Sequence, residues 1–172
     1  MSFLSSLLHP RSNIHLEDGL AQLYALKPTN KPQNHLLMVS LAEDKIIRAL
    51  KRGADPDRLV DHKKIALHSH TPTALNVALY CHNADVCLSL VEHGVDFMCC
   101  DGLTLWAEQL KSIDQTFGDT PHPQDQAEIV DRFLSVGQAM CRKNASMNGG
   151  EGCDLLGNRC VLALVYFGGD TL

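Results

Sequence analysis

Residues 84–97 read Ala-Asp-Val-Cys-Leu-Ser-Leu-Val-Glu-His-Gly-Val-Asp-Phe, a short amphipathic helix that stops at a glycine. Weaker copies of this pattern occupy 43–57 and 127–137. The glycines that end the three copies recur about every forty residues, a period typical of stacked helical repeats. Such arrays usually bind other macromolecules. The three glycines are Gly53, Gly94 and Gly137. The sequence therefore predicts a stacked helical repeat protein that binds another macromolecule, but it does not identify that partner.

The stretch 73–97 predicts one complete helix–turn–helix unit. Its first helix follows Thr71-Pro72, and either Thr71 or Thr73 is suited to cap the first turn. A break at His82-Asn83 separates it from the second helix, whose apolar residues recur at helical spacing. His93 lies in the last turn, and Gly94 follows as a left-handed C-cap. The chain then continues in an extended conformation.

Five segments of this chain resemble the ankyrin repeat. Lys-Arg-Gly-Ala-Asp at 51–55 and Glu-His-Gly-Val-Asp at 92–96 match the end of the family's repeat, and 127–134 matches its second helix. Residues 101–106 and 154–165 match the loop exit that opens a further unit. The resemblance implies an all-α, ankyrin-type solenoid of about three to four helix–turn–helix repeats with long finger loops. The repeats are expected at 33–57, 71–97, 102–137 and, truncated, 157–172, within a domain spanning 33–172.

The departures from the family pattern lie in the connections and at the ends. Long connections are expected at 56–72, 112–124 and 138–157, and insertions in solenoids often map to the binding side. Residues 1–32 are expected to form an N-terminal cap whose helix spans 16–26. At the other end, 161–167 reads as an apolar helix. We expect it to pack back as an atypical cap; the alternatives are dimerisation through this helix and a natural chain that continues.

Charge and composition exclude several classes of function. The formal charge is −5, whereas binding to nucleic acid needs a basic face. No apolar run approaches the length of roughly 20 residues that crosses a bilayer, so no membrane association is predicted. The seven cysteines are odd in number and are interpreted as reduced thiols in a cytoplasmic protein. That cytoplasm is bacterial, or that of a host if the protein is secreted as an effector.

No metal, cofactor or catalytic centre is predicted. His62, His68 and His70 are interpreted as polar loop residues, since no Cys-x2-Cys pair completes a zinc signature. Cys81 and His82 are sequence neighbours, so their side chains do not face each other on a helix. The alternative is a small cysteine- or metal-dependent enzyme on an ankyrin-like frame. One hyper-reactive thiol or stoichiometric zinc would reveal it.

The function expected is therefore that of a protein–protein interaction module, not an enzyme, acting as a monomer on another protein. Binding is assigned to the finger loops and the concave helical face, in an effector or in a regulatory or immunity-type protein. Trp106 has two interpretations, a core residue at the leucine position of the repeat or an exposed binding anchor. The terminal Asp170-Thr171-Leu172 is a weak candidate for a carboxylate ligand. The residues expected to contact the partner are Arg58, His62, Lys63, Lys64, His68, Met98, Asp101, Trp106, Arg142 and Lys143.

Overall fold

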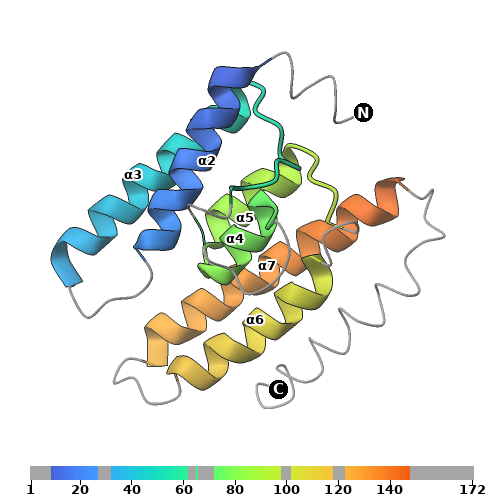
Figure 1. Cartoon of the computed structure of the whole chain (residues 1–172). Helices are drawn as coiled ribbons and strands as arrows, with labels where there is room; N and C mark the ends of the chain where they lie inside the picture. Colours follow the sequence, from blue (N-terminus) through green and yellow to red (C-terminus); the bar gives the residue numbers. More distant parts are fainter. Residues whose placement is uncertain are drawn as a thin grey trace. The chain divides into compact units, whose positions relative to one another are not determined.

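A computed structural model describes residues 9–26, 32–61, 65, 72–97, 102–117 and 123–147. Within these ranges the chain is helical, and the pairing of extended backbone is limited to one isolated bridge. The all-α prediction is therefore confirmed (Figure 1). The helices are α2 (Pro10–Ala25), α3 (Pro32–Lys51), α4 (Ala74–Tyr80), α5 (Ala84–Glu92), α6 (Gly102–Phe117) and α7 (Pro123–Met147).

The chain divides into two compact units, one ending at Gly102 and one beginning at Leu103. Helices α2 to α5 belong to the first unit, while α7 and nearly all of α6 belong to the second. The expected truncated repeat at 157–172, with the helix 161–167, lies outside the described residues. So does the C-terminal tripeptide.

Helices α2 and α3 form an antiparallel pair in the first unit (Figure 1). Three contacts along the pair fix its direction: Ser12 Oγ donates to Arg52 O, Asp18 pairs with Lys45, and Gly19 lies against Ile46. A Cβ atom at Gly19 would come within 2.6 Å of Ile46 Cγ1. The close approach of the two helices thus requires a glycine at this position.

Helices α4 and α5 form the helix–turn–helix that the sequence predicts. Thr73 is the N-cap of α4 and forms a capping box with Asn76. Asn83 caps α5 by accepting from the Val86 N–H at 3.0 Å, and Gly94 follows α5 with a φ of 90°. The two predicted helices, the break between them and the stop at Gly94 are therefore confirmed.

The α4–α5 pair packs on the α2–α3 pair helix by helix, α4 on α2 and α5 on α3. Tyr24 of α2 stacks on Tyr80 of α4 with ring centroids 5.9 Å apart. Asn83 donates to Glu43 of α3 at 2.6 Å. One side of the α2–α3 pair is thus covered by apolar and polar contacts from within the chain.

The expected repeat at 33–57 contains a single helix, so the prediction of a helix–turn–helix in this segment is wrong. No glycine or proline interrupts 33–52, and α3 runs through to Lys51. Gly53 then ends the helix with a φ of 84°, as its sequence position predicted. The expected capping helix at 16–26 is present but begins earlier, at Pro10, because proline is accommodated in the first turn.

The two ends of the expected finger at 56–72 pair with each other as antiparallel backbone. Leu59 bridges Thr73, and the Val60 N–H donates to Pro72 O at 2.8 Å. Ile65 is fully buried, so this long connection contributes to the core. The remaining positions of the finger, 62–64 and 66–71, lie outside the described residues.

The second unit contains the helix pair α6 and α7, which Figure 1 shows side by side and antiparallel. Trp106 of α6 is 2 % exposed, and its Nε1 donates to Phe133 O of α7 at 2.8 Å. Gly137 lies inside α7, where an added Cβ would fall 2.4 Å from Trp106 Cζ2. The prediction that Gly137 ends a helix is therefore wrong: this glycine admits the indole ring and is no C-cap.

The helices of the second unit are also longer than predicted. Helix α7 continues to Met147, so the expected finger at 138–157 is wrong for residues 138–147. Helix α6 extends to Phe117 and α7 begins at Pro123, which shortens the expected connection at 112–124. Packing across the pair favours long helices even where single residues are weak helix formers.

Candidate binding surface

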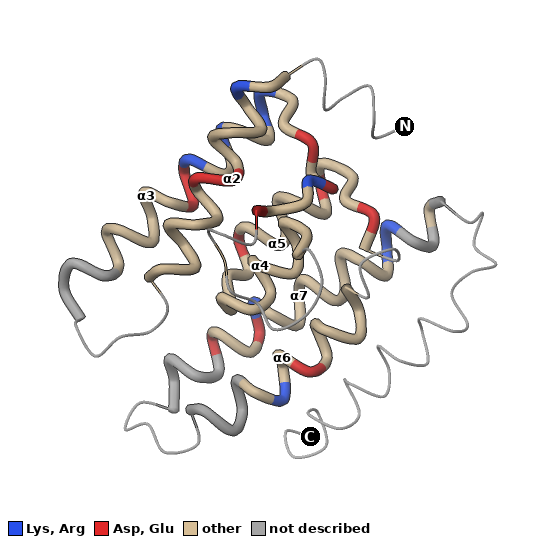
Figure 2. The backbone as a smooth tube through the Cα atoms, in the orientation of Figure 1, with Lys and Arg blue, Asp and Glu red and all other residues tan. Residues whose placement is uncertain are grey.

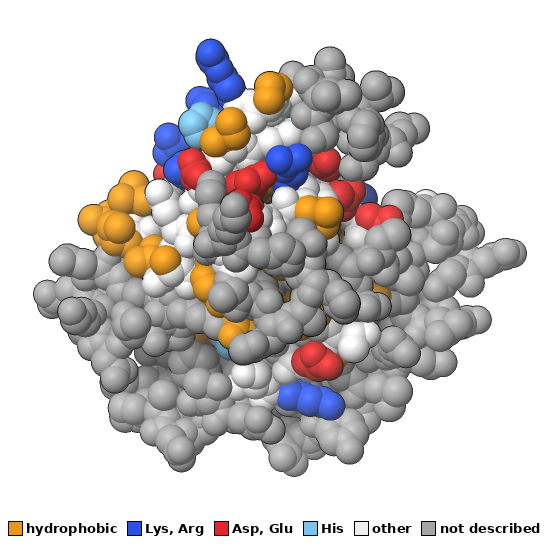
Figure 3. Space-filling model, in the orientation of Figure 1, with side chains coloured by type: hydrophobic (Ala, Val, Ile, Leu, Met, Phe, Trp, Pro, Cys, Tyr) orange, Lys and Arg blue, Asp and Glu red, His pale blue; other side chains and the backbone are white. Residues whose placement is uncertain are grey.

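The outer side of α3 is apolar along its first half. Ala42, Ile46 and Leu50 face the core, whereas Leu37 and Leu41 lie about half a helical turn away and are 63 % and 55 % exposed. Leu36 and Met38 flank them and are also exposed. Figure 3 shows hydrophobic side chains gathered over this part of the first unit. We call Leu36, Leu37, Met38 and Leu41 the α3 apolar face.

The clustering of four exposed apolar side chains distinguishes this face, because single exposed leucines are common on protein surfaces. Of the large apolar side chains exposed in the described residues, those outside the α3 apolar face are Ile14 and Leu59. The sequence from Pro32 to Ala42 carries no acidic or basic residue apart from one histidine. Contiguous apolar surface of this kind typically marks a site of protein contact.

Charged pairs border the apolar face on the side where α3 continues (Figure 2). Arg48 Nη2 lies 2.7 Å from Oδ2 of Asp44, one turn earlier on the same helix. Lys45 Nζ lies 3.9 Å from Oδ2 of Asp18 in α2. The border therefore has two acidic and two basic side chains, and its formal charge is balanced.

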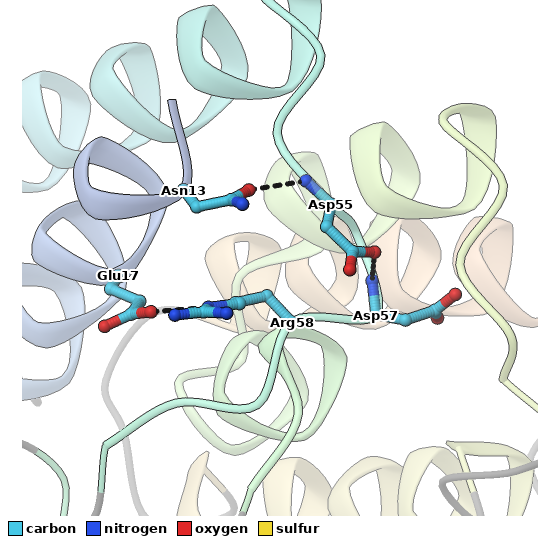
Figure 4. A network of polar contacts seen from close by, with 5 residues as sticks. All are labelled: Asn13, Glu17, Asp55, Asp57 and Arg58. Atoms are coloured by element: carbon cyan, nitrogen blue, oxygen red, sulfur yellow. Dashed lines mark hydrogen bonds and ion pairs between the residues drawn. The ribbon is translucent and has the colours of Figure 1, made fainter. Parts of the chain in front are cut away.

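A second polar group joins α2 to the loop after α3 (Figure 4). Asn13 is buried and its Oδ1 accepts from the Asp55 N–H at 2.8 Å. Arg58 Nε donates to Glu17 Oε1 at 2.6 Å. Arg58 was expected to contact a partner, but its guanidinium already forms an ion pair that joins the loop to α2. The structure thus gives Arg58 a structural role that its position in the sequence did not reveal.

Asp57 joins the loop that follows Gly53 to the loop that follows Gly94. The Asp96 N–H donates to Asp57 Oδ1 at 2.6 Å, and the Asp57 N–H donates to Asp55 Oδ1 at 3.1 Å. Burial raises the pKa of Asp57, and the neighbouring carboxylates of Asp55 and Asp96 raise it further; the bond from the Asp96 N–H opposes them in part. The carboxylate therefore accepts a hydrogen bond in a position where burial and neighbouring negative charge destabilise its ionised form.

We expect Asp57→Asn to stabilise the protein at pH 7 relative to Asp57→Ala and to the parent. The amide keeps an oxygen acceptor for the Asp96 N–H and removes the desolvated charge. Because the folded-state pKa is raised, the stability linked to Asp57 is present below its unfolded value of 3.8 and is lost as the pH rises. Urea denaturation should therefore show the advantage of Asn at pH 7 and a smaller one at pH 3.5.

The alanine variant is the control for the hydrogen bond. Asp57→Ala removes the charge and also the acceptor, which costs about 1 kcal/mol. Equal stability of the Asn and Ala variants at pH 7 would show that this bond contributes nothing. An Asn variant less stable than the parent at pH 7 would contradict the charge argument.

The other residues expected at the partner surface have different positions. Trp106 is buried, so the core interpretation is favoured and the indole offers no surface to a partner. Arg142 is exposed on α7 and its Nε donates to Gln138 O, while Lys143 beside it is half-buried. His62, Lys63, Lys64, His68, Met98 and Asp101 lie outside the described residues.

The described cysteines differ in state. Cys87 is fully buried, and burial raises the pKa of its thiol well above the usual value, which opposes the thiolate form. Cys81 is a half-buried thiol that forms no disulfide. Cys141 is disulfide-bonded, so the expectation of reduced thiols throughout is wrong. Spacing along the chain did not reveal this bond, because pairing depends on distance in space.

Within the described ranges, no group of three or more His, Cys, Asp and Glu side chains has the arrangement of a metal site. None of the helices described there is both long and apolar enough to cross a membrane. Neither finding assigns a chemical activity to this part of the chain.

The α3 apolar face is the feature that sequence reasoning missed. The repeat pattern assigned 33–57 to two short helices, and this placed Leu36 and Leu37 in a different helix from Ile46. The available signal was the long uncharged stretch before Glu43 on a segment without glycine or proline. Which side of a continuous helix remains uncovered depends on its neighbours, and these are not visible in the sequence.

In the comparisons with known proteins, no family model, no curated protein and no solved structure matches this chain. The resemblance to ankyrin repeats therefore depends on the residues quoted above.

Proposed function

We propose that this chain is a protein–protein interaction module with a divergent ankyrin-type scaffold. The α3 apolar face carries the proposal, since four large apolar side chains are exposed together on one rigid helix. Anchors on a preformed helix lose little conformational freedom on binding, which favours affinity. The surface differs from the one expected from the sequence, which consisted of finger loops and the concave helical face.

Three observations support the ankyrin-type part of the proposal. The unit from Thr73 to Gly94 is a capped helix–turn–helix that ends in a positive φ. An antiparallel pair of backbone segments forms the root of the preceding loop. Within the first unit, Asp57 and Asp96 follow the two C-cap glycines, and the Asp96 N–H donates to Asp57 Oδ1. Cytoplasmic location and an effector or immunity-type role belong to the same proposal.

A capture experiment with matched variants tests the proposed surface. Leu41→Glu places a charge in the α3 apolar face, and Leu59→Glu is the control because Leu59 has the same exposed fraction, 55 %. Lys63→Ala/Lys64→Ala tests the finger loop separately and leaves the Arg58–Glu17 pair intact. Each tagged variant is incubated with lysate of the organism that encodes the chain, and the retained proteins are quantified by mass spectrometry.

We expect a protein retained by the parent to be lost with Leu41→Glu and kept with Leu59→Glu, because a buried charge without a partner opposes binding strongly. Loss with the lysine variant alone would assign binding to the finger and contradict the α3 surface. Retention of no protein by the parent, the chain itself included, would contradict the function as a whole.

A further inference from the structure

The α2–α3 pair is a layer with one covered side and one apolar side. Its covered side packs against α4 and α5, and its other side presents Leu36, Leu37, Met38 and Leu41 to solvent. In stacked helical proteins the terminal layers carry a polar outer side where that side faces water. An apolar outer side is the property of an internal layer, which indicates that another helical layer covers it.

From this arrangement we infer that the occupant is a second copy of the same chain, paired with the first through the α3 apolar face. The inference rests on the proposed function, because it names the partner for the same surface. A two-fold pair brings identical surfaces together, so the surface must be self-complementary. Both the spacing of the leucines and the charges around them meet this requirement.

The apolar positions suit an antiparallel contact of α3 with its copy. Leu37, Leu41, Asp44 and Arg48 follow one another at four, three and four residues, which places them on one stripe of the helix. With the two-fold axis midway between the leucines, Leu37 of one copy lies opposite Leu41 of the other. Leu36 and Met38 then flank this centre, and Asp44 and Arg48 fall outside it. The result is an apolar centre with a charged rim, the usual organisation of a protein interface.

The charges around the α3 apolar face permit a second copy to approach. The chain has a formal charge of −5, so two copies repel each other over most of their surface. At the α3 border, however, Asp44 is balanced by Arg48, and Asp18 by Lys45. A balanced border neither repels its own copy nor selects a strongly acidic or basic protein.

The size of the apolar centre sets the expected strength of association. Two copies contribute eight large apolar side chains, and their burial favours association against the loss of rotational and translational freedom. A dissociation constant in the micromolar range is therefore expected. Each substitution in a two-fold interface acts twice, so Leu41→Glu should weaken association by at least about 100-fold.

Sedimentation equilibrium of the full chain tests the inference. The chain has a mass of 18.9 kDa, and the parent should approach twice this mass at about 100 µM. Leu41→Glu should remain at the single-chain mass, while Leu59→Glu should associate like the parent. Leu37→Gln is a milder second variant in case the charge disturbs folding, and far-UV circular dichroism verifies the helical content of each. A non-reducing gel excludes copies joined by an intermolecular disulfide.

A photo-crosslinking amino acid at position 37 separates the failure of this inference from the failure of the proposed function. In cells, a crosslinked product of twice the chain mass containing only this chain supports the second copy. A parent chain that stays monomeric and crosslinks to a different protein overturns the second copy and leaves the binding function intact. A monomeric parent with no crosslinked product overturns both. Association that is unchanged in Leu41→Glu assigns the dimer to another surface and also overturns the inference.

Discussion

Trp106→Ala is expected to lower the free energy of unfolding of the second unit by about 3–5 kcal/mol. The indole is 2 % exposed and occupies the space between α6 and α7. Its removal leaves a cavity and also takes the Nε1 donor from Phe133 O. Urea denaturation followed by far-UV circular dichroism measures the change, because Trp106 is the only tryptophan and its fluorescence is lost in the variant.

Gly137 provides a specific control for this prediction. In the parent, Gly137→Ala places a Cβ within 2.4–2.8 Å of three indole atoms, and overpacking of this kind costs about 1–3 kcal/mol. In the Trp106→Ala background that obstacle is absent, and alanine in a helix interior is favoured over glycine by about 1 kcal/mol. The effect of Gly137→Ala should therefore change sign between the two backgrounds.

A double-mutant cycle measures this coupling directly. Equal effects of Gly137→Ala in both backgrounds would show that the glycine does not accommodate the indole. It would also restore the interpretation of Gly137 as a residue chosen for backbone conformation.

Phe97→Ala is expected to lower the free energy of unfolding of the first unit by about 3–5 kcal/mol. Phe97 is fully buried after α5, and its neighbourhood is so tight that a Cβ at Gly102 would lie 3.1 Å from Phe97 Cβ and 2.9 Å from Leu75 Cδ2. The surroundings have little freedom to collapse into the space, because the Gly102 N–H also donates to Phe97 O at 2.9 Å. Thermal and urea unfolding followed by circular dichroism both report the loss.

Two variants control for the general effect of removing an apolar side chain. Phe97→Leu keeps most of the volume and should cost well under half as much as alanine. Leu59→Ala removes a side chain that is more than half exposed, and its effect should stay within about 0.5 kcal/mol. A loss after Phe97→Ala as small as that after Leu59→Ala would contradict the core position of the phenylalanine.

Local signals in the sequence predicted local structure well. Thr73, one of the two candidate caps, and Asn83, in the predicted break, are N-caps because their side chains accept from backbone N–H groups three residues ahead. Gly53 and Gly94 end helices because each adopts a positive φ that other residues rarely adopt. These interactions lie within a few residues of the chain, and the pattern around them was sufficient to predict the unit from 73 to 94.

The role of a glycine is not predictable from the surrounding sequence where a long-range contact determines it. Gly137 resembles Gly94 in the sequence, since both follow an apolar helical stretch. A C-cap glycine provides backbone freedom, whereas Gly137 provides space for a ring from another helix. The sequence around a glycine does not distinguish these two uses, because the second depends on Trp106.

The candidate site was less predictable than the fold. Arg58 was chosen as an exposed basic residue, but Glu17, far away in the sequence, binds it. The α3 apolar face was missed because its exposure depends on where α2, α4 and α5 pack. By itself the sequence determined the helical class, the break between α4 and α5 and the helix ends at Gly53 and Gly94, because short-range hydrogen bonds and backbone conformation govern them. Only the tertiary structure decided which glycine admits a ring, which charge is already paired and which side of α3 remains open, since each depends on residues brought together by packing.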